Sequence, residues 1–411
     1  MTIRADERTE AEWLLVIDGP VTPPGGAAAA PWIEERILGV SVVLRLALTA
    51  QAAGARAIAI SPGAAQRDVQ RSLADPRLRI PLIDEEDRPS IVEFRMTTPS
   101  VRIPANTVIH KATLIALRDR ADEGEVMLSF SGAPRGAGGL YGFEPIFVTG
   151  AAAARAAERA LLRSLRKPQD GWASTILNRR ISLFLTRFLV ATPLKPNQVS
   201  VAILGVGLLG AFFASRGTYE SMLFGAALFQ AQSVLDGCDG EMSRLTFRGS
   251  RTGEWLDTVG DDLTNYSFFA GAAWGLYSAT GHVVYLALGA VTVASGIIGS
   301  GLEYRYLIRI GSGDLLKYPL GIGNAPSGEG APPKSVLGRA LDAVSPLFKR
   351  DTFVLLTLIG AALGGMGPFL AAAALGAVGV LAAVVGAEVR MSRERSGARP
   401  AARVDPVLPR D

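Results

Sequence analysis

Apolar runs long enough to cross a lipid bilayer fill most of the second half of the chain. A transmembrane helix needs roughly 20 consecutive, predominantly apolar residues. Six segments meet or approach this length: 199–215, 221–235, 263–280, 283–302, 352–366 and 369–389. The second and fifth are short, so they must extend into flanking residues. The chain is 49% apolar, and the sequence predicts an all-α membrane domain of six helices.

Basic residues set the predicted orientation of these helices, because Lys and Arg accumulate in short cytoplasmic connections. The connections near Arg216, Gly281 and Gly367 hold almost none. The segment 304–350 and the C-terminal tail are basic by contrast. We therefore expect both termini and this long connection to face the cytoplasm, in a multi-pass protein of a bacterial-type inner membrane.

Residues 12–150 have a different pattern, in which short apolar runs alternate with helical stretches and turn residues. Runs such as WLLVID and AIAIS are typical of buried strands. The stretch 35–60 predicts a helix that ends near Gly54 and leads into a strand, which is a unit of a parallel sheet. The predicted parts are a soluble α/β domain (1–150), a linker with an interfacial helix (151–196), the membrane domain (197–390) and a basic cytoplasmic tail (391–411).

The predicted interfacial helix precedes the first span. Its apolar positions recur at helical spacing and arginines occupy the other positions, a pattern typical of helices that lie on a membrane. The apolar residues are Leu177, Ile181, Phe184 and Phe188, and the basic residues are Arg179, Arg180 and Arg187. An amphipathic helix packed on the soluble domain is the alternative.

The counts of charged residues, cysteine and histidine exclude several classes of protein. Lys and Arg exceed Asp and Glu by only four, whereas a nucleic-acid-binding domain needs a concentrated basic face. One cysteine, Cys238, rules out an internal disulfide, and the distant His110 and His282 argue against a histidine-based zinc site. Any metal must bind mainly through carboxylates, which favours Mg²⁺ or Mn²⁺. The polar N-terminus predicts no cleaved signal peptide.

Four aspartates, Asp236, Asp239, Asp257 and Asp261, stand between the second and third predicted spans. The first two are three residues apart and the last two four apart, so each pair occupies one face of a helix. Carboxylates at a membrane edge are costly and call for a functional explanation. Two such helices facing each other would bring the carboxylates together, where cations would relieve their repulsion. The alternative is that these acids only solvate a cytoplasmic loop.

The spacing of these acids resembles the signature of the CDP-alcohol phosphotransferases, D-x2-D-G-x2-A-R-x8-G-x3-D-x3-D. The sequence keeps every spacing, and its one departure is Ser243 in place of alanine, a small-for-small change. The segment TPLKPNQVS, which contains Asn197, resembles the element that opens the family's first span. KRDTFVLLTLIG resembles the basic start of the fifth, so the resemblance covers 171–389.

The resemblance implies a membrane transferase that moves a phosphoalcohol or phosphatidyl group from a CDP-linked donor to a hydroxyl acceptor and releases CMP. Two divalent ions, Mg²⁺ or Mn²⁺, would bind the four aspartates, and Asp261 would also take the acceptor's proton. The implied CDP pocket comprises Asn197, Gly240, Ser243, Arg244, Ser250 and Gly253. The basic residues that either bind an acceptor phosphate or only mark topology are Arg305, Arg309, Lys349 and Arg350. Expected partners are the donor, an acceptor such as a phosphorylated polyol, membrane lipid and a second copy of the chain, with no nucleic acid.

A soluble α/β domain ahead of this membrane domain resembles the fused inositol-phosphate cytidylyltransferase and di-inositol-phosphate-phosphate synthase proteins. In that family the soluble, nucleotidyltransferase-like domain makes the CDP-alcohol, and its glycine-rich loop uses Arg and Lys to hold a triphosphate. The matching stretch here, 18–31, has glycines but no Arg or Lys. We therefore expect a degenerate domain with a scaffolding, dimerisation or regulatory role. The alternative is an active cytidylyltransferase that uses other cations, such as Arg36 or Lys111.

A membrane transporter or a non-enzymatic scaffold would also combine several spans with a soluble domain. A transporter is expected to have repeated or interrupted spans with polar groups at mid-membrane. The aspartates here lie toward the predicted cytoplasmic edge instead. Neither alternative explains four carboxylates at the spacing of the motif, and we therefore favour the transferase.

Overall fold

The computed structural model describes residues 13–21, 32–63, 66–84, 99–121, 125–128, 143–166, 174–320 and 350–397. The chain forms two compact units. The first unit consists of Met1–Asp170, Arg179–Pro196 and Cys238–Gly249, and the second of Gly171–Asn178, Asn197–Gly237 and Ser250–Asp411. Helix α8 (Tyr219–Thr246) contributes residues to both units.

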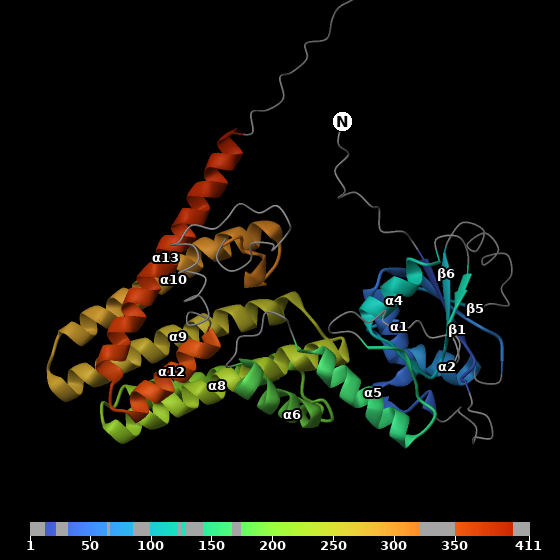
Figure 1. Ribbon diagram of the computed structural model, residues 1–411, viewed down its shortest axis with the longest axis horizontal. Helices are drawn as coiled ribbons and strands as arrows, with labels where there is room; N and C mark the ends of the chain where they lie inside the picture. Colours follow the sequence, from blue (N-terminus) through green and yellow to red (C-terminus); the bar gives the residue numbers. More distant parts are fainter. Residues whose placement is uncertain are drawn as a thin grey trace, which may run out of the picture. The chain divides into compact units, whose positions relative to one another are not determined.

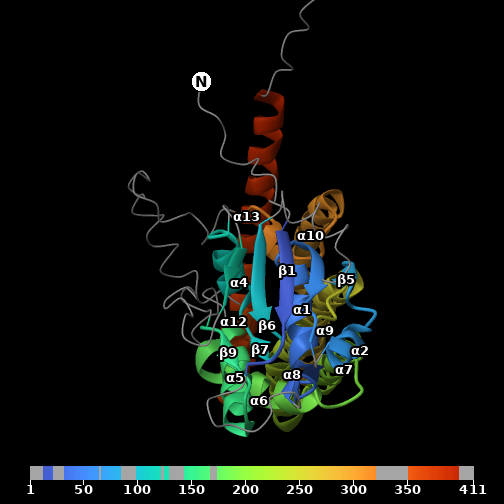
Figure 2. The ribbon, with the colours of Figure 1, turned by 90° about the vertical axis from the view of Figure 1, so that its right-hand side faces the viewer.

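A five-stranded sheet with the order β5-β4-β1-β6-β8 forms the centre of the first unit (Figure 2). All four strand pairings in this sheet are parallel. The strands are β1 (Trp13–Asp18), β4 (Ala55–Ile60), β5 (Leu82–Asp84), β6 (Ser100–Pro104) and β8 (Glu125–Met127). The predicted α/β architecture with a parallel sheet is therefore confirmed for this part of the chain.

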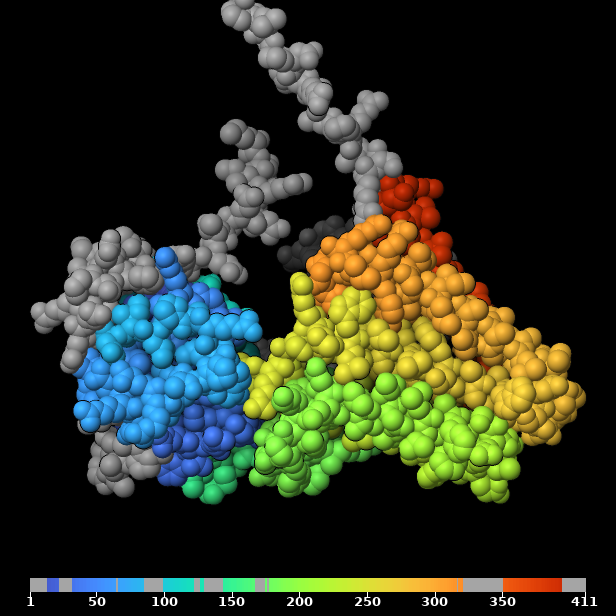
Figure 3. Space-filling view, turned by 180° about the vertical axis from the view of Figure 1, so that it is seen from behind, coloured from blue at the N-terminus to red at the C-terminus, as the bar shows by residue number. Residues whose placement is uncertain are grey.

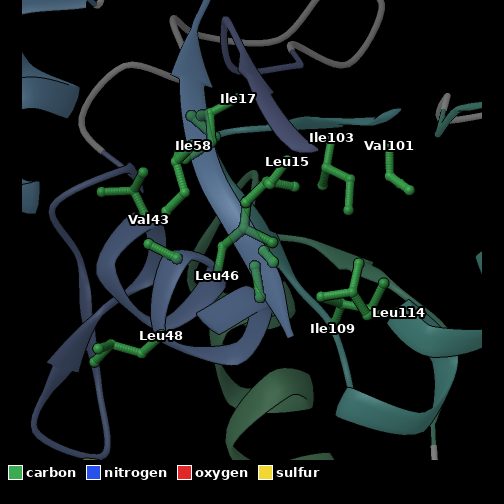
Figure 4. Packing of buried hydrophobic residues seen from close by; sticks show 14 of the residues in the cluster. Leu15, Ile17, Val43, Leu46, Leu48, Ile58, Val101, Ile103, Ile109 and Leu114 are labelled. Carbon is green, nitrogen blue, oxygen red and sulfur yellow. The ribbon is translucent and has the colours of Figure 1, made fainter. Parts of the chain in front are cut away.

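Strand β1 is buried on both faces, as parallel strands usually are. Side chains alternate along a strand, so Leu15 joins the larger apolar cluster while Leu14 joins a second cluster on the other face. Figure 4 shows Leu15 and Ile58 of the sheet packed with Leu46 of helix α1 (Val42–Ala52). This burial on both faces explains why the strand reads as a continuous apolar run.

The predicted helix-to-strand unit is also present, since α1 leads into β4 across Gly54. Gly54 has a φ of +87°, in the left-handed region that favours glycine. The remaining elements of the unit are α2 (Gln66–Leu73), α4 (Lys111–Arg118), α5 (Ala151–Ser164), α6 (Arg179–Leu189) and the antiparallel pairs β2 (Arg36–Ile37) with β3 (Val40–Ser41) and β7 (Thr107–Val108) with β9 (Ile146–Phe147).

The second unit is helical (Figure 1). Its elements besides α8 are η2 (Ser174–Asn178), α7 (Pro196–Ala214), α9 (Arg251–Thr280), α10 (Val284–Ile310), η3 (Leu315–Lys317), α12 (Arg350–Ala362) and α13 (Met366–Gly397). Helix α10 packs against both α9 and α13, and the space-filling view shows the contact between α9 in yellow and α10 in orange (Figure 3). Glycines permit the closest approaches: a Cβ on Gly275 of α9 would lie 2.2 Å from the carbonyl oxygen of Ala214 at the end of α7.

Three helices of the described chain are long and apolar enough to cross a membrane: Pro196–Ala214, Val284–Ile310 and Met366–Arg393. They contain most or all of the predicted spans 199–215, 283–302 and 369–389. The other three predicted spans fall mainly in α8, α9 and α12. Helices α8 and α9 combine apolar residues with the motif carboxylates, and α12 has only 13 residues. The count of six spans therefore stays a prediction.

Candidate active site

The first half of the motif lies inside one continuous helix. Asp236, Asp239, Gly240, Ser243 and Arg244 all belong to α8, which continues to Thr246. The sequence analysis places these acids after the second predicted span, 221–235, and the helix of that span continues past them. Asp239 is only 6% exposed, and its Oδ1 accepts a hydrogen bond from the backbone N–H of Gly240.

The second half of the motif begins at the N-terminus of α9. Ser250 is the N-cap residue, and its hydroxyl accepts a hydrogen bond of 3.0 Å from the backbone N–H of Gly253. Such a cap satisfies one of the free N–H groups of a helix start and is worth about 1 kcal/mol. Asp257 and Asp261 follow one turn apart on α9 and therefore lie on the same face.

Arg350, the first residue of α12, brings two of the four aspartates together. Its NH1 lies 3.1 Å from an oxygen of Asp236 and 2.9 Å from an oxygen of Asp261, while NH2 donates to the side-chain oxygen of Gln232 at 2.7 Å. Asp257 also interacts electrostatically with Arg350. Carboxylates from α8 and α9 thus share one cationic partner. The sequence had suggested Arg350 as a ligand for an acceptor phosphate or a marker of topology.

Three residues of the predicted CDP pocket are close neighbours in the second unit. A Cβ on Gly253 would lie 2.9 Å from the side-chain oxygen of Asn197 and 3.2 Å from the hydroxyl oxygen of Ser250. Glycine is required here because a side chain at position 253 would displace one of the two polar groups. The polar groups of Asn197 and Ser250 therefore meet at the N-terminus of α9.

The other three predicted pocket residues lie near the end of α8 in the first unit. A Cβ on Gly240 would lie 3.2 Å from NH1 of Arg244, and a Cβ on Gly249 would lie 3.4 Å from the hydroxyl oxygen of Ser243. Arg244 is exposed. A planar guanidinium in that position can donate two parallel hydrogen bonds to a phosphate.

The four aspartates are chemically suitable ligands for a divalent metal, but their side chains are not arranged as a metal site. Among the residues that the structure describes, no three His, Cys, Asp or Glu side chains are grouped closely enough to hold a metal ion. Carboxylate oxygens are nevertheless the ligands that Mg²⁺ and Mn²⁺ prefer. Because Asp236 and Asp261 already converge on the positive group of Arg350, a divalent cation suits these two carboxylates in place of that guanidinium.

Glu241 is a buried carboxylate that sequence reasoning missed. It is 0% exposed, and Arg179, Ser182 and Thr186 of α6 all donate to it, at 2.8, 2.7 and 2.7 Å. A buried charge is stable only when it is paired and hydrogen-bonded, and these three donors meet that condition. The motif leaves this position variable, so the sequence contained no signal for it. Its effect is to fasten α6 beside the motif segment of α8.

The C-terminal end of α8 is capped by two arginines from the part of the first unit that contains the parallel sheet, here called the sheet domain. NH1 of Arg45 donates to the carbonyl oxygen of Leu245 at 2.9 Å, and NH1 of Arg77 donates to that of Thr246 at 2.7 Å. Arg45 also donates to the carbonyl oxygen of Ile37 at 2.7 Å. Cations near the last carbonyls of a helix satisfy those groups and oppose the negative end of the helix dipole.

Arg45 keeps its charge although it is 2% exposed. Burial, with a smaller contribution from the nearby Arg77 charge, lowers the pKa of Arg45 to about 9. This value is still well above neutral pH, so the guanidinium is protonated and can serve as a charged cap.

Four buried polar atoms of the second unit have no hydrogen-bond partner among the described residues: Oε1 of Gln230, Oδ1 of Asn265, Nε of Arg350 and Oγ1 of Thr352. Those of Asn265 and Arg350 belong to residues placed beside Asp261, since Arg350 is ion-paired with it. Asn265 follows Asp261 by four residues on α9 and therefore shares its face. A buried unpaired polar group costs about 1–3 kcal/mol. Both atoms are therefore suited to a hydrogen bond with a bound substrate.

Two of the other basic residues suggested for an acceptor phosphate, Arg305 and Arg309, lie on α10. Arg305 forms an ion pair of 3.3 Å with Glu388 of α13, and its side chain is 57% exposed. Arg309 is exposed near the end of α10. Lys349 lies outside the described residues, as do positions 22–31 of the predicted glycine-rich loop.

Comparison with known proteins agrees with the motif. A family model described as CDP-alcohol phosphatidyltransferase matches residues 193–317, which include Asn197 and the complete aspartate signature. Residues 193–317 therefore match the CDP-alcohol phosphatidyltransferase family, in agreement with the resemblance of the motif.

The chain is also similar to curated proteins named bifunctional IPC transferase and DIPP synthase. It is 36% identical to the Aquifex aeolicus protein over 107 residues, 26% of this chain and 24% of that protein. It is 35% identical to the Archaeoglobus fulgidus protein over 142 residues, 34% of this chain and 28% of that protein. The matched segments thus span about a quarter of these relatives' length.

Among solved structures, the chain is similar to Mycobacterium tuberculosis phosphatidylinositol phosphate synthase with CDP-DAG bound. The identity is 17%, the match covers 56% of this chain and 99% of that one, and the TM-score is 0.35. This similarity does not establish a shared fold.

Proposed function

We propose that the protein is a membrane transferase that moves a phosphoalcohol or phosphatidyl group from a CDP-linked donor to a hydroxyl acceptor. The observation that carries the proposal is that Asp236 and Asp261, both in the segment that matches the CDP-alcohol phosphatidyltransferase model, converge on Arg350. The curated relatives are named as synthases and transferases, which supports a group-transfer reaction. The description of the matched family supports a CDP-alcohol donor.

In the proposed reaction, the acceptor oxygen attacks the donor phosphorus that carries the alcohol. The bond between this phosphorus and the oxygen bridging to CMP breaks, so CMP leaves with the bonding electron pair. Asp261 takes the proton of the acceptor hydroxyl as that oxygen attacks. Asn265, one turn further along α9, would accept a hydrogen bond from the acceptor through its unpartnered oxygen.

Asp236, Asp239, Asp257 and Asp261 would hold two divalent ions, Mg²⁺ or Mn²⁺. When bound, such ions neutralise charge on the phosphate oxygens and on the leaving group. Arg350 supplies the positive charge that keeps Asp236 and Asp261 together in their absence. Asn197, Ser250 and Gly253, with Gly240, Ser243 and Arg244, would bind the CDP moiety, Arg244 through its phosphates.

The membrane part of the proposal comprises six spans with both termini in the cytoplasm. Three spans rest on the long apolar helices described above. Helix α6 would lie in the cytoplasmic interface, because its apolar residues Ile181, Phe184 and Phe188 are 40%, 61% and 56% exposed while its polar residues face Glu241. The proposed assembly is a homodimer.

The sheet domain would act as a scaffold for the transferase. Arg45 and Arg77 hold the end of α8, the helix that carries Asp239 and Arg244. This role needs no nucleotide chemistry and agrees with the absence of Arg and Lys between positions 18 and 31. The second candidate is a bifunctional enzyme, favoured by the name of the curated relatives.

Purified full-length protein, supplied with CDP-DAG or a CDP-polyol and a panel of polyol phosphates and lipid alcohols, tests the transferase. CMP release that requires both an acceptor and Mg²⁺ or Mn²⁺ is expected. Absence of CMP release with every donor–acceptor pair would count against the transferase. Lipid mass spectrometry of cells with and without the protein extends the search to substrates outside this panel.

The scaffold role is tested with the full chain carrying Asp261→Asn, which silences the transferase step. No pyrophosphate should be released from CTP with any polyol phosphate. Pyrophosphate release in this variant would make the protein bifunctional.

A further inference from the structure

A pocket of about 500 Å³ lies within the first unit. It is formed by the β2–β3 hairpin, the start of α1, the end of α2 with the segment after it, and the residues that follow α8. Its charged lining residues are Glu34, Arg36, Arg71, Asp75, Arg77 and Arg248. Four guanidinium groups against two carboxylates give the pocket a surplus of two positive charges, and none of these residues belongs to the aspartate motif.

One of the two carboxylates is already neutralised. Asp75 forms a fork-to-fork ion pair with Arg77, with Nε–Oδ1 and NH2–Oδ2 distances of 2.8 Å. This hydrogen bonding is the main reason that the pKa of Asp75 lies below its usual range, and the charge of Arg248 adds to it. Asp75 therefore leaves little negative charge to repel an anion.

Arg36 and Arg248 supply the available positive charge. Both are exposed, and neither forms an ion pair within the part of the chain that the structure describes. Arg71, in contrast, lies 3.7 Å from Asp68. The remaining carboxylate, Glu34, lines the same pocket and opposes an anion.

The chemistry of the pocket selects phosphate among common anions. Guanidinium groups on two separate segments can each donate two parallel hydrogen bonds, and a phosphate offers enough oxygens and charge for both. A carboxylate offers only two oxygens and one charge, which a single arginine matches. A volume of about 500 Å³ also lies within the usual range for small-molecule sites, so the space admits a phosphate ester as well as the free ion.

We propose that this pocket binds a phosphate-bearing anion through the guanidinium groups of Arg36 and Arg248. The anion is either a soluble phosphate compound or the headgroup of an anionic lipid. The site goes beyond the transferase reaction and requires no turnover.

The pocket is joined to α8 by Arg77. This side chain lines the pocket and also donates to the carbonyl oxygen of Thr246 at 2.7 Å. Arg248 follows two residues later, and its backbone N–H donates to the carbonyl oxygen of Ser243 at 3.0 Å. A bound anion therefore stabilises the end of the helix that carries Ser243 and Arg244, because a ligand that binds only the folded state shifts unfolding by mass action.

The test uses purified full-length protein in neutral detergent with EDTA, and inorganic pyrophosphate as the probe in isothermal titration calorimetry. EDTA removes divalent ions, so the aspartate motif does not contribute a metal-bridged site. Wild-type protein should bind pyrophosphate saturably, and more weakly as NaCl is raised. The double variant Arg36→Gln, Arg248→Gln should bind at least about tenfold more weakly, which corresponds to ~1.4 kcal/mol.

Two further variants sharpen the test. Glu34→Gln should bind more tightly, because it removes the opposing carboxylate. Arg67→Gln is the matched control, since Arg67 is exposed on α2 but does not line the pocket, and its affinity should equal that of wild type. All four substituted side chains are exposed, so thermal unfolding without ligand should be nearly unchanged.

The source of the anion is distinguished in nanodiscs. If anionic lipid fills the pocket, pyrophosphate should bind wild-type protein more weakly in phosphatidylglycerol discs than in phosphatidylcholine discs, and the double variant should lose this difference. If the occupant is soluble, affinity should be the same in both discs. The proposal would be overturned if wild type and the double variant bound pyrophosphate with equal affinity. It would also be overturned if pyrophosphate did not bind saturably in detergent and the lipid of the nanodisc had no effect.

Discussion

The hydroxyl of Tyr304 donates a hydrogen bond of 2.6 Å to the carboxylate of Asp262. This bond joins α10 to α9 at the residue directly after the predicted base, Asp261. Ser300 donates to the same carboxylate oxygen at 2.5 Å, and Tyr266 lies 2.6 Å from the Ser300 hydroxyl. A carboxylate withdrawn from water is costly unless its oxygens are hydrogen-bonded, so these donors both stabilise Asp262 and fix α9 against α10.

Tyr304→Phe should therefore destabilise the protein by about 1–3 kcal/mol, because it leaves an acceptor on a partly buried carboxylate short of one donor. We also expect lower turnover, since Asp261 would be held less firmly. Thermal unfolding in detergent and CMP release measure the two effects. Tyr306→Phe is the control on the same helix, since Tyr306 packs by its ring against Tyr318. Equal effects of the two substitutions would show that the hydroxyl of Tyr304 is not what matters.

Each of Asp236→Ala, Asp239→Ala and Asp257→Ala should abolish CMP release while leaving membrane insertion intact, because each removes a proposed metal ligand. EDTA should silence the wild-type enzyme, and Mg²⁺ or Mn²⁺ should restore it. Asp314→Ala is a control outside the motif, at the N-terminal side of η3. Full activity in any one of the three motif variants would contradict the two-metal assignment.

Arg350→Gln tests whether this arginine takes the place of a cation between Asp236 and Asp261. Without the guanidinium the two carboxylates repel each other, so the metal-free variant should unfold at a lower temperature than wild type. Added Mg²⁺ should then raise the unfolding temperature of the variant more than that of wild type. Arg305→Gln, which breaks an exposed ion pair with Glu388, should show no such difference. A Mg²⁺ response equal to that of wild type would count against the idea.

Arg45→Met tests the scaffold role of the sheet domain. Methionine is similar in length to arginine and fills the buried space, but it leaves the carbonyl oxygens of Leu245 and Ile37 without their donor. A loss of about 3 kcal/mol is expected from breaking a buried charged hydrogen-bond network. Limited proteolysis and CMP release should both report it, whereas Arg159→Met, at an exposed position of α5, should be neutral. Unchanged stability and activity in Arg45→Met would show that the cap is dispensable.

The sequence predicted features that depend on local pattern. The parallel sheet, the turn at Gly54 and the aspartate spacing each depend on a short stretch of sequence. In these stretches the side-chain period, the backbone freedom of glycine or the helical spacing determines the local structure. The contacts of Arg45 could not be read in this way, because its partner Leu245 is 200 residues away. Chain folding alone determines which carbonyl a buried arginine meets.

The same limit explains which contacts of the candidate site the sequence did not reveal. Arg350 stands among several basic residues near span ends, and its sequence neighbourhood does not reveal that α12 begins beside Asp236 and Asp261. Glu241 and Asp262 were missed because each stands next to a motif residue and reads as ordinary helix polarity. Their importance comes from donors on other helices, namely α6 and α10.

Asp261→Asn separates the fourth aspartate from the other three, because a base and a metal ligand should fail differently. The substitution keeps the size of the side chain and one oxygen, but it removes the negative charge and the basicity needed to accept the acceptor's proton. Binding of the CDP-linked donor should survive within about tenfold, or ~1.4 kcal/mol, since it depends chiefly on the other three carboxylates and Arg244. Turnover should fall by on the order of 10² to 10⁴, the usual range for loss of a general base.

Both effects of Asp261→Asn can be measured on one preparation, by titration of the donor with Mg²⁺ present and by CMP release after the acceptor is added. Asp239→Asn provides the matched comparison, because it should lose donor affinity through its metal. If Asp261→Asn loses donor affinity as severely as Asp239→Asn while turnover from the bound state is unchanged, Asp261 acts only as a ligand. The base must then be another group that can reach the acceptor hydroxyl.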